Sequence, residues 1–393
     1  MIPCSQDFLN AMRAPVKQMF LKFEFYDSKM NYINEFTKQI TESDLGSISV
    51  DYSRPIRRNF TFSLMNKNNE FTWGENSALI WIDKRVKVFT GLKLKNGTIE
   101  YVPQGVYILT EPSDSHTIDS KNTVLTGQDK MYLLTDKRGR FKFQTTIEVG
   151  ANIATTIKML AGKVGETQFN FDTVTETVPY TLTYEPNDSI YDAVQELAQL
   201  ARCEIFYDVF GFLRLKKIDL NDFDSQPVTW VYRYGDPNEK FYAGNVRKMD
   251  ETNLANRIYV LGGSSQTATS SYELVVTETN PLWANSPYTI EKIGDIIYGH
   301  NDFKPDPIIS NVEDAKFRAK FELMKRLGYS ERLTLNIAPN FLHDVYDVIQ
   351  IEDETNNVTG KYMLESFTLP LKPELMTCEC LKYRKLLSNW DFI

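Results

Sequence analysis

Residues 189–217, SIYDAVQELAQLARCEIFYDVFGFLRLKK, form the stretch of sequence that decides the fold. Apolar residues recur at helical spacing in its first half, and Ser189 can cap that helix with an acidic residue three positions later. The second half alternates like two strands, joined by a turn in which Gly211 can adopt a positive φ. The stretch therefore predicts a helix over 189–202 and a hairpin over 203–217.

The residues upstream extend this unit into a small α/β domain. Apolar residues at helical spacing predict a helix over 151–164, and Gly165 is suited to end it. Two short runs, 168–172 and 179–185, have strand composition. We predict a small α/β domain over residues 141–222.

The N-terminal part of the chain has β character. Short apolar runs alternate with turn residues, and the Asn96-Gly97 pair inside 85–111 is a strong hairpin signal. The expected strand segments are 16–27, 45–53, 57–65 and 85–111. We predict an antiparallel β-barrel or sandwich over residues 1–140.

The C-terminal part returns to β character and contains one helix. Strand-like runs are 228–234, 256–263, 331–337, 345–353 and 361–373. The polar stretch 264–273 is expected to be a loop, and Asn311 and Gly328 bracket a predicted helix over 311–327. We predict a second β domain from 223–265 and 330–393, with an inserted loop and helical region over 266–329. The expected fold class is α+β, with two antiparallel, barrel-like, tube-type β domains flanking the small α/β domain.

Composition describes a folded protein of several domains. The 393 residues are 42% hydrophobic and 24% charged, with a mean hydropathy of −0.36. No apolar run is long enough for a membrane span, and the N-terminus does not resemble a secretory signal. The net charge of −8 argues against a nucleic-acid grip that depends on neutralising phosphates.

The cysteines and histidines do not indicate a catalytic or metal site. Cys378 and Cys380 are spaced to share one face of a strand, but no histidine or further cysteine lies near them in sequence to complete a zinc site. We expect these two residues, and also Cys4 and Cys203, to be free thiols. His116 is expected in a polar loop, and His300 has an acidic neighbour but no nucleophile. His343, Asp344 and Asp347 imitate a metal cluster, although a turn is the favoured reading.

Other candidate sites are also weak. The sequence contains no nucleotide-binding, zinc-protease or serine-hydrolase motif. The basic cluster at 137–142 is expected to be a solvated domain junction. Five tryptophans could serve as sugar platforms, but we expect them in the core: Trp73, Trp81, Trp230, Trp283 and Trp390. We assign no catalytic, cofactor-binding or metal-binding residues and no cofactor.

The order of these segments resembles the hub proteins of phage tails. These are the central baseplate hub of contractile tails and the N-terminal hub of tail-associated proteins in long flexible tails. The similar segments, in chain order, are 40–66, 103–112, 123–136, 189–217, 253–263, 338–353 and 360–371. One departure is Tyr346, which stands where the family's Gly-Asp-x-Ile turn has its glycine.

The resemblance implies a non-enzymatic structural protein of the virion, assembled in the host cytoplasm. It implies a homotrimer that joins a six-fold tail tube to a three-fold tip and lines the channel through which DNA is ejected without specific binding. The implied partners are the tail tube protein, the distal tail protein ring, the tape measure protein and a tip fibre or spike. In that setting the 189–217 unit is expected to be a spacer between the β domains. Two alternatives stay open, a tail-tip peptidoglycan hydrolase and a carbohydrate-binding protein of the tip.

Overall fold

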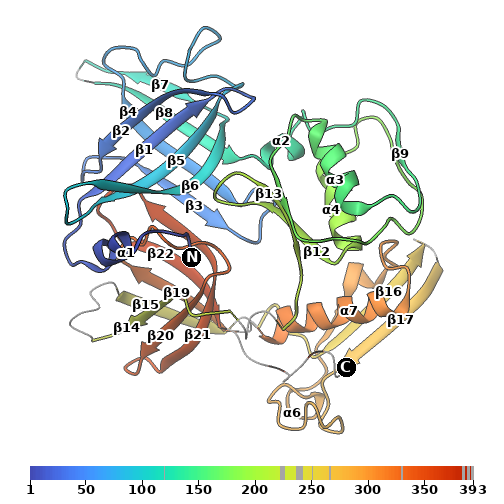
Figure 1. The fold of residues 1–393 in the computed structure, drawn as a ribbon. Helices are drawn as coiled ribbons and strands as arrows, with labels where there is room; N and C mark the ends of the chain where they lie inside the picture. The colour runs from blue at the N-terminus through green and yellow to red at the C-terminus, as the bar shows by residue number, and fades with distance from the viewer. Residues whose placement is uncertain are drawn as a thin grey trace.

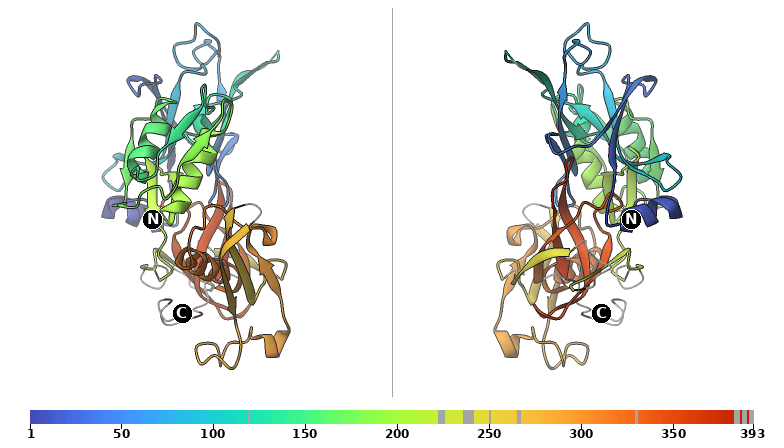
Figure 2. Two further views of the ribbon diagram at one scale, coloured as in Figure 1. Left: turned by 90° about the vertical axis from the view of Figure 1, so that its right-hand side faces the viewer. Right: turned by 90° about the vertical axis from the view of Figure 1, so that its left-hand side faces the viewer.

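The structure is a computed structural model that describes residues 1–118, 120–221, 226–235, 242–249, 251–264, 267–328, 331–382, 386 and 390. The expected boundaries at 222/223, 265/266 and 329/330 touch residues outside this described part. Two β halves, an α/β unit and a fourth unit around helix α7 are arranged as Figure 1 shows, and side views show that the molecule is narrower in depth than in width (Figure 2).

One 14-stranded sheet runs through both β halves. The N-terminal β half contains β1 (Met19–Tyr26), β2 (Tyr32–Gln39), β3 (Gly46–Asp51), β4 (Arg58–Met65), β5 (Arg85–Lys93), β6 (Ile99–Leu109), β7 (Ser113–His116) and β8 (Lys121–Asp129), preceded by helix α1 (Gln6–Arg13). The C-terminal β half contains β14 (Trp230–Arg233), β15 (Tyr242–Met249), β19 (Glu331–Ile337), β20 (Val348–Asp353), β21 (Val358–Pro370) and β22 (Met376–Lys382). The main path through the sheet is β15-β19-β22-β21-β3-β4-β8-β6-β5-β1-β2.

The two β halves are joined into one sheet, because β3 and β21 pair. Strand β21 is 13 residues long; its first part pairs with β20, and Ser366–Pro370 pair with Ser47–Asp51 of β3. A single hydrophobic core then extends under both halves. Barrel-like domains are not confirmed, because no strand pair among the described residues closes either half.

Alternation of apolar and polar residues explains the strands. In β4 the side chains of Phe60, Phe62 and Leu64 are buried while the residues between them are partly exposed. The ring of Phe23 on β1 lies 5.5 Å from the rings of both Phe60 and Phe62. The strands pack through this aromatic contact, which buries a large apolar area.

The α/β unit has its own core and two capped helices. It contains α2 (Tyr132–Thr135), β9 (Thr145–Ile147), α3 (Ile153–Gly162), β10 (Phe169–Phe171), β11 (Leu182–Tyr184), α4 (Ile190–Leu200), β12 (Cys203–Tyr207) and β13 (Leu213–Lys217). The Ser189 hydroxyl accepts a hydrogen bond from the Asp192 amide at 3.2 Å, as a helix cap does. Gly211 has φ +86° in the turn between β12 and β13. The predicted helix and hairpin are therefore present, with the helix two residues shorter at its C-terminal end.

The fourth unit differs from the prediction in two ways. It contains β16 (Arg257–Ser264), β17 (Thr267–Val275), α6 (Ile290–Ile293), β18 (Ile297–Gly299), the 3-10 turn η1 (His300–Phe303), α7 (Val312–Leu323) and the π-turn η2 (Met324–Gly328). The strand predicted at 256–263 is present as β16, but it pairs with β17 and β18 in a separate sheet and not in the second β domain. The expected loop at 264–273 is mostly strand β17, with residues 265 and 266 outside the described part.

The error in β17 has a physical cause. Four of its nine residues are Thr or Ser; Thr packs well on a pleated surface, but both residue types also favour turns. Pairing with β16 and burial of Leu274 decide the outcome, while α7 covers this sheet with Ala315, Ala319 and Leu323 (Figure 1).

The tip of the β12–β13 hairpin reaches into the core of the β halves. Val209 is buried there with residues of the large sheet, and the Gly211 carbonyl accepts a hydrogen bond from Lys130 at 3.0 Å. A Cβ atom on Gly211 would lie 2.6 Å from Val106 of β6. The 189–217 unit is therefore anchored to the N-terminal β half and is more than a spacer.

We predict that Gly211→Ala destabilises the protein more than Gly165→Ala. Both glycines have a left-handed φ, which costs alanine about 1–2 kcal/mol, but only Gly211 also meets a neighbour. Overpacking adds about 1–3 kcal/mol for Gly211→Ala. Urea unfolding followed by circular dichroism measures the difference, and equal losses in the two variants would contradict the docking of the hairpin tip.

Asp129, at the end of β8, is a buried carboxylate at the base of the α/β unit. It accepts hydrogen bonds from the amides of Arg58 and Met131, each at 2.9 Å. Burial raises the pKa of Asp129 from 3.8 to about 6, although these hydrogen bonds act in the opposite direction. The folded protein therefore holds this proton more tightly than the unfolded chain does.

The pH dependence of stability follows from this pKa. The stabilisation from the Asp129 proton is complete below about pH 4 and is lost as the pH rises through about 6. We compare the unfolding free energy of the native chain with that of the Asp129→Asn variant. We predict that the native chain's advantage falls by on the order of 3 kcal/mol as the pH rises from about 4 through about 6. Urea unfolding at a series of pH values tests this, with Glu42→Gln at an exposed position as the control. A difference that does not change with pH would refute the prediction.

Candidate functional site: a cation-lined cleft between four units

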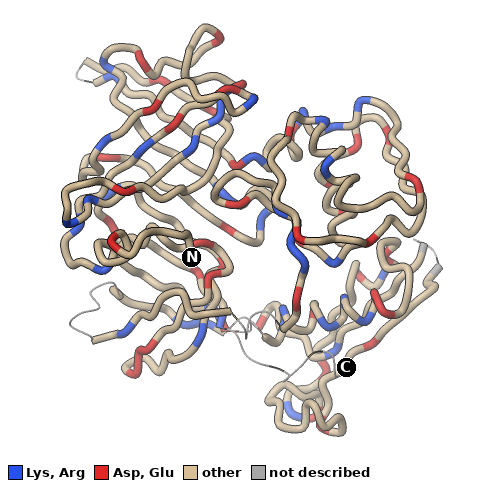
Figure 3. Tube along the Cα trace, in the orientation of Figure 1, with Lys and Arg blue, Asp and Glu red and all other residues tan. Residues whose placement is uncertain are grey.

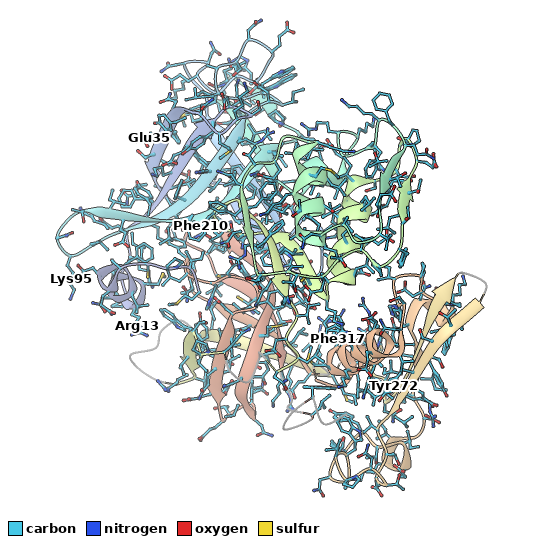
Figure 4. All side chains as sticks on the ribbon, turned by 45° about the vertical axis from the view of Figure 1, so that its right-hand side comes forward. Arg13, Glu35, Lys95, Phe210, Tyr272 and Phe317 are labelled. Carbon is cyan, nitrogen blue, oxygen red and sulfur yellow. The ribbon has the colours of Figure 1, made fainter. Side chains whose placement is uncertain are left out.

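The described structure contains a cleft of about 510 Å³ where four units meet. It lies between α4 and β12 of the α/β unit, α7 of the fourth unit, the turn at 52–57 that follows β3, and strands β19, β21 and β22 of the C-terminal β half. Figure 4 labels Phe317 on α7, and this residue lines the cleft. We refer to this feature as the junction cleft.

Two helices form opposite walls of the junction cleft. Residues three or four apart share a helix face, and each helix buries its apolar stripe in its own unit while a second face lines the cleft. The lining residues of and just after α4 are Tyr191, Gln195, Gln199 and Arg202, and those of α7 and η2 are Phe317, Arg318, Phe321, Glu322, Lys325 and Arg326. The Arg202 guanidinium donates to Asp314 at 2.7 Å and so connects the two walls.

Arg57 is the most buried cation of the cleft. Its residue is only 7% exposed, and its guanidinium lies 4.2 Å from the ring centre of Phe206. Nη2 donates to Glu204 at 3.4 Å, whereas the buried Nη1 has no hydrogen-bond partner among the described residues. Arg57 therefore keeps one buried donor unsatisfied.

Tyr346 stands beside Arg57 and has a left-handed backbone conformation. Its φ is +68°, in the left-handed region, and its hydroxyl donates to both carboxylate oxygens of Glu204. The ring centre of Tyr346 lies 4.4 Å from that of Tyr52. Tyr346 thereby forms a contact between the C-terminal β half and β12.

Burial keeps the two tyrosines of this cluster protonated. Burial, followed by the charge of Glu204, raises the pKa of Tyr52 to about 12. The same two causes raise the pKa of Tyr346 well above its ordinary value. Tyr346 therefore acts as a neutral hydrogen-bond donor and not as a general base.

Positive side chains outnumber negative ones in the junction cleft. Its described lining contains three glutamates, Glu204, Glu322 and Glu365, and seven cations, Arg54, Arg57, Arg202, Arg318, Lys325, Arg326 and Arg332. Arg54 pairs with Asp51, Arg332 pairs with Glu365, and Arg326 lies 3.8 Å from Glu322. Arg318 and Lys325 form no ion pair with the described residues. Lys and Arg recur along α7 in Figure 3, although the whole chain is acidic.

The histidines do not form a reactive site. His116 is exposed at the end of β7, and His300 bonds to Asp306 at 2.8 Å. His343 is buried, with Nε2 2.7 Å from the Tyr232 hydroxyl and Nδ1 3.6 Å from Asp347. Asp344 instead pairs with Arg58. The described residues contain no group of three or more potential metal ligands. The Asp347 amide donates to the Asp344 carbonyl at 3.2 Å, as in a turn.

The four cysteines are free, and three are buried. Cys378 and Cys380 share the buried face of β22, as their spacing predicts. Burial raises the pKa of Cys203 to about 12, so its thiol stays protonated near neutral pH. This thiol lines the junction cleft without the thiolate character of a nucleophile.

The tryptophans divide into core and surface residues. Trp230, Trp283 and Trp390 are buried, as expected. Trp73 and Trp81 lie on the surface with nearly parallel rings whose centres are 6.4 Å apart, so the core prediction is wrong for Trp73, which is exposed. In the basic cluster at 137–142, Arg138 pairs with Asp136 and Phe141 is buried in the α/β core.

Sequence patterns indicate only part of the lining of the junction cleft. The polar positions at intervals of four on α4 indicate an exposed helix face. No local signal brings this face to α7 or to the turn at 52–57, because those contacts join residues more than 100 positions apart. The cleft was therefore not predicted.

We predict that Tyr346→Phe loosens the contact between β12 and the C-terminal β half. The phenylalanine keeps the ring but leaves Glu204 with a weaker set of donors, at an expected cost of about 1–3 kcal/mol in unfolding free energy. Urea unfolding and amide hydrogen exchange in β12 measure the effect. Tyr234→Phe is the control, since Tyr234 is exposed. Unchanged stability and exchange in Tyr346→Phe would disprove the role of this hydroxyl.

No helix in the described part of the chain has both the length and the apolar character needed to cross a membrane. No protein-family model matches the sequence, and no curated protein matches it.

Solved structures do resemble this chain over most of its length. A tail protein from Neisseria meningitidis MC58 aligns with a TM-score of 0.62 and 13% identity, covering 93% of this chain and 98% of that chain. The 43 kDa tail protein of prophage MuSo2 from Shewanella oneidensis aligns with a TM-score of 0.60 and 10% identity, with the same coverage. Prophage tail protein gp18 from Listeria monocytogenes EGD-e aligns with a TM-score of 0.51 and 10% identity, covering 94% and 95%. The resemblance found in the sequence is thus confirmed for the fold: this chain has the fold of phage tail proteins.

Proposed function

We propose that this chain is a structural protein of a phage virion, the hub of the tail tip or baseplate. The observation that carries this proposal is the whole-chain fold match, which covers 93% of this chain and 98% of two tail proteins. The match includes the β halves, the α/β unit and the α7 unit together. The role proposed is non-enzymatic, and it agrees with protonated cysteines and histidines held in structural hydrogen bonds.

The arrangement of the strands supports assembly into a homotrimer. Each chain carries two β halves in one sheet, so three chains supply six halves, which suits a six-fold tail tube on one side and a three-fold tip on the other. Within the described residues, β2 and β15 each pair on one side only, which leaves backbone groups free for a neighbour. Val246 and Met249 of β15 are 51% and 65% exposed. Such apolar side chains beside a free strand edge are suited to an interface between protomers.

The charge of the chain suits a channel for DNA. With a net charge of −8, a ring of this protein lacks the overall positive field that would hold phosphates. In the proposed virion the hub contacts the tail tube protein, the distal tail protein ring, the tape measure protein and a tip fibre or spike. Assembly takes place in the host cytoplasm, and DNA passes the lumen without specific binding.

The trimer is tested by native mass spectrometry over a range of protein concentrations. We predict a species of three times the 45.4 kDa chain mass, and its loss in a variant that combines Val246→Glu with Met249→Glu. The charges repel across a packed interface, so the expected shift is at least tenfold in the concentration needed for assembly. Val16→Glu is the matched control, because Val16 is 83% exposed and lies outside the strands.

The two parts of this experiment separate two claims. A native chain that remains monomeric, both free and in assembled tails, would overturn the homotrimer. A trimer that survives the β15 substitutions would leave the homotrimer standing and overturn the placement of the interface at β15.

A further inference from the structure

We propose that the junction cleft is a docking site for an acidic, partly apolar peptide segment of a partner protein. The inference concerns a surface that the hub role does not require. It rests on the charge, burial and size of the cleft, each of which indicates part of the ligand's chemistry.

The charge of the lining indicates a negatively charged ligand. Seven cations face three glutamates in the cleft of a chain whose net charge is −8, so the local excess opposes the overall charge. Arg318 and Lys325, seven positions apart, lie on one side of α7 and η2 and form no ion pair with the described residues. Both lie over the ring of Phe321, at 5.8 Å and 5.5 Å from its centre, a contact that leaves their N–H donors able to bind carboxylates of a single segment.

Arg57 supplies a buried donor at the base of the cleft. Its residue is 7% exposed, and Nη1 is buried without a hydrogen-bond partner among the described residues. A guanidinium held over Phe206 and beside Glu204 has a fixed orientation, so its free donor is already positioned. A carboxylate or backbone carbonyl of the ligand would satisfy this donor.

The apolar part of the lining and the volume favour a peptide over a free anion. The cleft of about 510 Å³ lies within the roughly 300–1,000 Å³ range of sites for drug-sized molecules. An inorganic phosphate would fill a small part of it and leave Ile205, Ile218, Phe317 and Phe321 in contact with water. A segment that alternates acidic and apolar side chains covers both kinds of surface.

The position of the cleft indicates the consequence of binding. Its lining comes from the α/β unit, from α7, from the turn after β3 and from the C-terminal β half, so a ligand in it contacts four units at once. Such a ligand adds contacts between units that otherwise meet through a few polar links, such as Arg202 with Asp314. Binding is therefore expected to reduce the motion of α7 relative to α4.

The test uses the full chain and a fluorescein-labelled decapeptide of alternating Glu and Leu, measured by fluorescence anisotropy. A second peptide with Gln in place of every Glu serves as the uncharged probe. We expect the Gln peptide to bind at least tenfold more weakly. We expect a similar loss with the acidic peptide when Arg318→Gln and Lys325→Gln are combined, because neither cation forms an ion pair with a described residue. Gln199→Glu, a change of charge at nearly constant shape, is expected to weaken binding as well.

The control combines Lys29→Gln with Lys95→Gln, which removes two exposed cations of the N-terminal β half and leaves the cleft intact. Unchanged affinity is expected for this variant. Equal affinity of the two peptides, or equal loss in the cleft and control variants, would overturn the proposal. Displacement of the acidic peptide by millimolar inorganic phosphate but not by unlabelled peptide would show a small-anion site and also overturn it.

Native mass spectrometry of the Arg318 and Lys325 variant provides the remaining outcome. A change in oligomeric state would identify another copy of this chain as the occupant, against a separate partner. Peptide binding and oligomeric mass are independent readouts, so failure of the cleft proposal leaves the proposed hub role untouched.

Discussion

The pairing of β3 with β21 is the contact on which the rest of the structure depends. Five residue pairs, from Ser47 with Pro370 to Asp51 with Ser366, connect strands more than 300 positions apart in sequence. Just beyond this ladder the Tyr52 amide donates to the Glu365 carbonyl at 3.0 Å. The turn at 52–57 is thereby held against the C-terminal β half. Without this ladder, neither the shared core nor the junction cleft would exist in this form.

Polar links then orient the α/β unit on the sheet. The Lys130 ammonium lies 2.7 Å from Glu166, and Tyr207 donates to the same carboxylate at 2.6 Å, with all three side chains buried. Glu204 makes the corresponding contact on the other side, with Arg57 and Tyr346. Buried ion pairs add little net stability because of their desolvation, but an unpaired charge in the same place is costly. These links therefore act against other orientations of the unit, and apolar contacts such as that of Val209 supply the stability.

The helices and turns could be read from local patterns because their causes are local. The Ser189 cap, the apolar stripes of α3 and α4, and the positive φ of Gly97 and Gly211 all depend on residues a few positions apart. Helix α1 was missed even though the Ser5 hydroxyl accepts from the Phe8 amide at 3.1 Å, since eight residues give too little periodicity. Strand β17 was missed because Ser and Thr support both a turn and a strand until a partner strand decides.

The sequence by itself determined the helices α3, α4 and α7, the hairpin of β12 and β13, the buried face of β22, and an order of segments that resembles phage tail hubs. Only the tertiary structure decided that the two β halves share one sheet, that β16 belongs with α7, and that Arg57, Glu204 and Tyr346 meet beside a cation-lined cleft. The physical reason is sequence separation. Caps and periodicity are encoded within one or two turns of chain, whereas strand pairing and charge clustering depend on which distant surfaces bury each other.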